Sequence, residues 1–91
     1  MGYAMKYLTS ASQSAIIAAE SQISLNCGFP DSKGTLRWAI PQQSVDGTIW
    51  FIAEPEGYNE FTKDEMMQGV DLSQITSLER DEAWFPAVEG V

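Results

Sequence analysis

Residues 35–53 have the sequence TLRWAIPQQSVDGTIWFIA, which predicts a β-hairpin. Apolar and polar residues alternate from 35 to 43, which is the period of a strand with one buried face. Asp46-Gly47 is the strongest short signal for a tight hairpin turn. Residues 48–53 then form the second strand.

The predicted register gives this hairpin two apolar faces. With Asp46 and Gly47 as the two loop residues, Gln42 lies opposite Phe51. One face then collects Leu36, Trp38, Ile40, Ile49, Phe51 and Ala53. We expect a helix on that face. The other face carries Val45, Pro41, Trp50 and Ile52 beside Arg37 and Gln43. It is more apolar than a solvated sheet face requires, so we expect protein to cover it.

A helix is predicted before the hairpin, from Ser10 to Cys27. Ser10 and Gln13 match a capping box, which satisfies free amides at a helix start. The apolar positions at helical spacing are Ile16, Ala19, Ile23 and Cys27. Gly28 can take the left-handed conformation that ends a helix.

After the hairpin, Thr62 and Glu65 match a second capping box, and Gly69 limits that helix to about two turns. Residues 75–79 fit either a third strand or a helical turn, and we favour the strand. The fold class is therefore α+β. The N-terminal helix packs on a β-hairpin or small antiparallel sheet, followed by the short second helix, the third strand and a C-terminal aromatic tail. We expect one domain over 1–91, with 1–6 and 81–91 as terminal arms.

The residue content argues against an enzyme. The 91 residues include no histidine and one cysteine, Cys27. Histidine is the usual general base near neutral pH and the commonest metal ligand, and one cysteine cannot form a disulfide within the chain or a cysteine-rich zinc site. We predict no catalytic residues, no metal site and no cofactor.

The hydropathy of the chain argues against a membrane protein. The longest apolar runs, 15–19 and 49–53, are five residues each, whereas a membrane helix needs about 20. The N-terminus lacks the basic start and long apolar stretch of a secretory signal. We expect an intracellular, cytoplasmic protein without membrane contact.

The charge is negative and unevenly distributed. The formal net charge is -8. Residues 1–45 carry three basic residues and two acids, whereas 46–91 carry two basic residues and eleven acids. This balance disfavours direct binding to nucleic acid and to anionic lipid. The acidic surface comprises Glu54, Glu56, Glu60, Asp64 and Glu65. It either keeps the domain soluble or attracts a basic protein.

The predicted fold does not account for the burial of several large apolar residues. They form the predicted interaction surface: Trp50, Ile52, Tyr58, Trp84 and Phe85. Either the C-terminal tail folds back over the sheet, or two chains pair and bury each other's apolar patch. The favoured hypothesis is a non-enzymatic interaction or assembly module that binds a second copy through its apolar sheet face, or binds another protein.

Two alternatives remain. An acidic inhibitor or nucleic-acid mimic would place the acidic half in a phosphate-binding groove of a basic target. A carbohydrate or small-ligand module would use Trp50 and Tyr58 as stacking rings. In general style, with an early Ser/Ala-rich helix, a Trp-rich hairpin and no catalytic residues, the chain resembles accessory proteins carried by phages or prophages.

Overall fold

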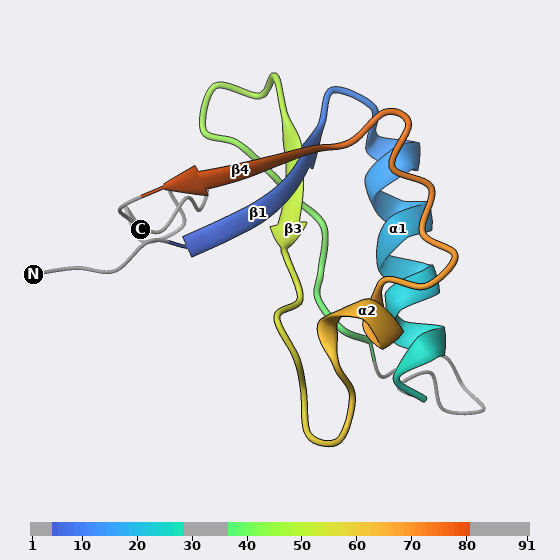
Figure 1. Ribbon diagram of the computed structural model, residues 1–91. Helices are drawn as coiled ribbons and strands as arrows, with labels where there is room; N and C mark the ends of the chain where they lie inside the picture. The colour runs from blue at the N-terminus through green and yellow to red at the C-terminus, as the bar shows by residue number, and fades with distance from the viewer. Residues whose placement is uncertain (1–4, 29–36, 81–91) are drawn as a thin grey trace, which may run out of the picture.

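A computed structural model describes residues 5–28 and 37–80 as a small α+β fold, which confirms the predicted class. The elements in chain order are β1 (Met5–Ser10), α1 (Gln13–Asn26), β2 (Gln42–Gln43), β3 (Trp50–Ala53), α2 (Lys63–Met66) and β4 (Thr76–Arg80). The four strands form one antiparallel sheet in the order β2-β3-β1-β4. Helix α1 packs beside this sheet, and α2 lies near the C-terminal end of α1 (Figure 1).

Strand β1 lies in the middle of the sheet and is not predicted by the sequence pattern. It pairs with β3 on one side and β4 on the other, so Tyr7 lies between Ala53 and Leu78. Met5 and Lys6, which the sequence analysis assigned to an arm, belong to this strand. Tyr7 and Leu8 are both buried although they point to opposite faces. A strand buried on both faces shows no alternation of apolar and polar residues.

The hairpin has the predicted register but a much shorter first strand. Gln42 pairs with Phe51 and Gln43 with Trp50, as expected. Residues 37–41, however, form no strand, and residues 35–36 lie outside the described ranges. Pro41 has no N–H to donate to a sheet. The backbone N–H of Trp38 donates to the side chain of Ser24 instead.

The turn of this hairpin is built around Asp46. Its Oδ1 accepts hydrogen bonds from Ser44 Oγ, Thr48 N and Thr48 Oγ1 at 2.7, 3.1 and 2.8 Å. These bonds, the one from Ser44 first, lower the pKa of Asp46. Gly47 takes a positive φ of 79°. The predicted turn is therefore present, although its loop spans residues 45–48 because Ser44 N donates to Ile49 O.

The prediction of which sheet face receives the helix is wrong. Leu8 and Ile52 pair across β1 and β3, and their face packs against α1. The buried cluster there comprises Leu8, Ile16, Ile23, Cys27, Ile52 and Met66. Phe51, expected under the helix, points to the opposite face and meets Tyr7 edge-to-face at 5.3 Å. Tyr7 and Phe51 are each 1% exposed and Ile52 is 2% exposed, so both faces of β3 are buried.

The N-terminal helix begins later than predicted. Its N-cap is Ser12, whose side chain accepts from Ala15 N. Ser10, the predicted cap, is the last residue of β1, and its hydroxyl accepts from Ser12 N at 2.9 Å. The predicted stop is confirmed, since Gly28 follows the helix with φ 72°.

The predicted elements after the hairpin, a short helix and a third strand, are both present. Glu65 N donates to Thr62 Oγ1 at 3.1 Å and Thr62 N donates to Glu65 Oε1 at 2.8 Å, which completes the capping box. Helix α2 is shorter than two turns, and Met66 is fully buried. The third strand is present as β4, one residue later than predicted. Trp84, Phe85 and the rest of 81–91 lie outside the described residues.

Candidate functional site

The outer side of α1 carries no charge. The helix contains one charged residue, Glu20, and that residue is buried at 5% exposure. The exposed positions are Gln13, Ser14, Ile17, Ala18, Ser21 and Leu25. In a chain with 20% charged residues, a solvated helix face ordinarily carries some of them. The outer side of α1 is therefore a candidate contact surface.

A groove runs beside this side of the helix, and we call it the α1 groove. Its volume is about 580 Å³. One wall is α1 and the other is the irregular segment 37–41, with Trp50 of β3 beside them. The lining residues are Gln13, Ile17, Glu20, Ser21, Ser24, Leu25, Arg37, Ile40, Pro41 and Trp50. Ile17, Leu25 and Ile40 are 46, 64 and 67% exposed, so the groove presents apolar side chains to solvent.

Hydrogen bonds to two buried side chains of α1, Glu20 and Ser24, hold the second wall against the helix. Ser24 Oγ donates to Glu20 Oε2 at 2.5 Å and accepts from Trp38 N at 2.6 Å. Ala39 N donates to the same Glu20 oxygen at 3.4 Å. Buried polar groups are costly to leave unpaired, so this network fixes the backbone position of the wall. The groove is thus preformed.

The predicted interaction residues do not share one surface. Trp50 lines the α1 groove, but Ile52 is in the core and offers no surface to a partner. Tyr58 packs edge-to-face on Trp38 at 6.1 Å and is not among the groove residues. Trp84 and Phe85 lie outside the described residues. Trp50 and Tyr58 therefore do not line one common groove.

Sequence reasoning missed the other apolar residues of the groove. Ile17, Ser21 and Leu25 follow one another at four-residue intervals on α1, so they share a side of the helix that differs from the buried one. The absence of charged residues along this second side of the helix could have predicted a contact surface from the sequence. Ile40 was assigned to a strand facing the helix, and its exposure follows from the missing strand at 37–41.

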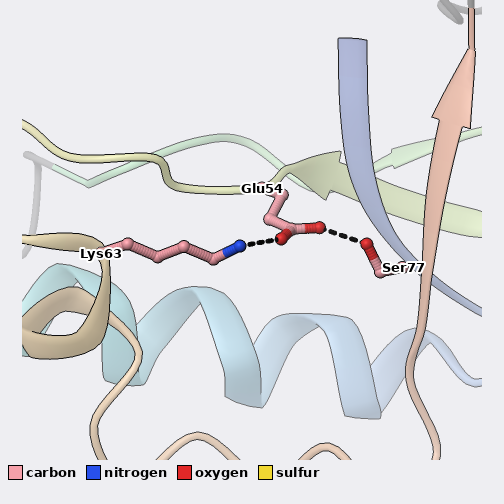
Figure 2. Close-up of polar contacts among 3 residues, drawn as sticks. All are labelled: Glu54, Lys63 and Ser77. Carbon is pink, nitrogen blue, oxygen red and sulfur yellow. Dashed lines mark hydrogen bonds and ion pairs between the residues drawn. The ribbon is translucent and has the colours of Figure 1, made fainter. Parts of the chain in front are cut away.

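Two of the five predicted acidic surface residues have structural contacts. Glu54 Oε2 pairs with Lys63 Nζ at 2.5 Å, and Ser77 Oγ donates to Glu54 Oε1 at 2.5 Å (Figure 2). Glu65 completes the capping box of α2. Glu56, Glu60 and Asp64 are exposed. The acidic surface thus comprises fewer free carboxylates than the sequence suggested.

Glu54 connects three elements. It follows β3, its ion-pair partner begins α2, and Ser77 belongs to β4. Burial alone would raise the pKa of Glu54, but the hydrogen bonds from Lys63 and Ser77, with the charges of Lys63 and Lys6, outweigh burial and lower it. A cavity of about 320 Å³ lies beside the pair. Both Glu54 oxygens already accept hydrogen bonds, so we assign Glu54 a structural role.

We expect Glu54→Gln to lower the free energy of unfolding by about 1 kcal/mol near neutral pH, which is less than the usual contribution of a charged hydrogen bond because the Lys63 side chain is 43% exposed. The lowered pKa of Glu54 means that the unfolded chain takes up the proton first as pH falls. The stabilisation is therefore complete above the ordinary value of 4.5 and is lost as pH falls through the folded-state pKa. Urea unfolding at several pH values measures this.

Glu56→Gln is the matched control, because Glu56 is exposed two residues away. It should change the free energy of unfolding by less than about 0.5 kcal/mol. Equal losses in the two variants, or a loss for Glu54→Gln that stays constant down to low pH, would contradict the structural role of Glu54.

Neither a group of metal-ligating side chains nor an activated cysteine occurs in the part of the chain that the structure describes. Within 5–28 and 37–80, no three His, Cys, Asp or Glu side chains are grouped so that they could hold a metal ion. Cys27 is buried, and burial raises the pKa of its thiol, which disfavours the reactive thiolate. Neither helix of the described ranges is long and apolar enough to cross a membrane.

Comparison with known proteins identifies no similar protein. No protein-family model matches the chain, and no curated protein and no solved structure is significantly similar to it.

Proposed function

We propose that this protein is a non-enzymatic docking module that binds another protein through the α1 groove. The observation that carries the proposal is the combination of exposed Ile17, Leu25 and Ile40 around a preformed groove on a chain of net charge -8. Exposed apolar clusters on small soluble domains mark interaction sites more often than isolated apolar residues do.

The lining of the groove suits a helical occupant. Apolar side chains from both walls are exposed in it, and amphipathic helices bind such grooves through apolar anchors three to four residues apart. The apolar residues of the site would supply most of the affinity, because burying a large aliphatic side chain contributes about 1.5–3 kcal/mol. The exposed acids Glu56, Glu60 and Asp64 would raise the rate at which the partner is encountered and would orient it on the surface.

We also propose a cytoplasmic location. The support is Cys27, an unpaired thiol in the core, which suits a reducing compartment.

A peptide-library selection against the immobilised chain tests the docking function. Random peptides of about 16–20 residues are long enough to form a helix on binding. We expect the selected peptides to carry apolar residues three to four positions apart and to bind the wild-type chain. Binding should fall at least tenfold in Leu25→Glu, because a carboxylate then enters the apolar groove.

Val45→Glu is the control for that selection. Val45 is as exposed as Ile40, at 67%, and lies in the hairpin turn outside the groove. Peptides should bind this variant as they bind the wild type. A selection that yields no binders, or binders that do not distinguish the two variants, would overturn the proposed docking site.

A further inference from the structure

We infer that the occupant of the α1 groove is an amphipathic helix with a lysine or arginine between its apolar anchors, and that this basic residue donates to the buried carboxylate of Glu20. The inference rests on the proposed docking function and names the chemistry of the partner. Glu20 lines the groove and is 5% exposed. Among the residues that the structure describes, it is the one buried charged residue.

One oxygen of this carboxylate has no donor among the described residues. Ser24 Oγ and Ala39 N both donate to Oε2, at 2.5 and 3.4 Å. Within 5–28 and 37–80, no hydrogen bond reaches Oε1, and the ion pair found there joins Lys63 to Glu54 instead. Buried polar groups are ordinarily hydrogen-bonded, and buried charges are ordinarily paired. Oε1 is therefore an acceptor for a donor that enters the groove.

The wall of the groove does not require a charge at position 20. Its contacts with Glu20 use a single acceptor oxygen, and the amide oxygen of a glutamine would accept the same two hydrogen bonds. A glutamine would also avoid the cost of burying an unpaired charge. The packing of the free chain thus explains neither the negative charge nor the second oxygen. A cationic donor in the occupant accounts for both.

Arg37 also lines the groove and would favour a carboxylate in the occupant. Its side chain is exposed, so water and salt screen its charge. Glu20 is buried, and its charge is screened far less. The net charge of -8 acts in the same direction as Glu20, because it attracts cationic segments from a distance. The buried charge and the net charge therefore both select a basic residue over an acidic one.

The position of Glu20 along α1 predicts where the basic residue lies in the occupant. Ile17 and Leu25 are exposed in the groove and are eight residues, or about 12 Å, apart along the helix. Glu20 lies between them in the same helix. An occupant helix that lies along α1 therefore has apolar residues about seven or eight positions apart, with the basic residue between them. Lysine and arginine suit this place because their aliphatic stems pack on apolar side chains.

A double-mutant cycle tests the inference. The first probe is the tightest-binding peptide selected on the wild-type chain, which we expect to carry the basic residue; the second probe has methionine in its place. This substitution should weaken binding to the wild type at least tenfold, because Glu20 stays buried and loses its cation. In Glu20→Gln it should weaken binding less than threefold, because the glutamine keeps the two wall hydrogen bonds but has no charge to pair.

Glu79→Gln is the matched control for net charge. Glu79 is exposed on β4, which β1 separates from β3, and it is not among the groove residues. The substituted peptide should lose as much affinity for this variant as for the wild type. Circular dichroism melting checks that both variants fold, and the comparison of the two peptides on the wild-type chain needs no variant.

The outcomes separate the inference from the docking function. Peptides that Leu25→Glu weakens, but that share no basic residue or show no coupling to Glu20, overturn the basic occupant and leave the docking function. A shared acidic residue would assign Arg37 as the charged contact and would overturn it as well. Sedimentation equilibrium tests a second copy as the occupant: a dimer that Leu25→Glu dissociates and Val45→Glu does not also overturns the inference. A selection without groove-dependent peptides overturns both proposals.

Discussion

Ile52→Lys abolishes folding at room temperature, whereas Ile40→Lys leaves the free energy of unfolding within about 0.5 kcal/mol of the wild type. Ile52 packs against Leu8 and Ile16 in the cluster beneath α1. Burying an ammonium among apolar side chains costs several kcal/mol in addition to the lost apolar contact. The total free energy of unfolding of a native domain is about 5–15 kcal/mol, so the folded state would not persist.

Ile40→Lys is a matched control because the same residue type changes in the same way at an exposed position. Far-ultraviolet circular dichroism and urea unfolding measure both variants. Ile52→Ala provides a milder test, with an expected loss of about 2–5 kcal/mol. A folded Ile52→Lys chain of near wild-type stability would show that β3 turns the other face towards α1, as the sequence pattern had suggested.

Local signals predicted the parts of the fold that depend on local chemistry. The Asp46-Gly47 turn fixed the register of Gln42 with Phe51, because a turn determines which residues face each other. The Thr62 and Glu65 side chains form the predicted capping box because both partners lie within one helical turn. These features need no information from distant residues.

The tertiary arrangement could not be obtained in the same way. Phe51 and Ile52 are adjacent and both apolar, so either could have faced the helix. The choice is made by β1, which pairs with β3 and adds Leu8 to the Ile52 side. The short sequence around Tyr7 and Leu8 does not show the alternation of a half-buried strand, so the central strand remained unrecognised.

The candidate site was only partly accessible from the sequence. Trp50 was identified because the hairpin pattern left it unburied, and it lines the groove. The irregular wall around Ile40 depends on hydrogen bonds from the backbone of Trp38 and Ala39 to side chains of α1. Such contacts join residues 14 to 19 positions apart and have no periodic signature.

Peptide binding to matched groove variants tests the central claim, docking through the α1 groove, most directly. Peptides selected on the wild-type chain are titrated against the wild type, Leu25→Glu and Val45→Glu. Leu25→Glu places a carboxylate in the groove, whereas Val45→Glu adds the same charge at an exposed position of the hairpin turn.

The dissociation constants give the result. Docking through the α1 groove predicts that Leu25→Glu weakens binding at least tenfold while Val45→Glu binds like the wild type. Equal binding by the two variants would contradict the account.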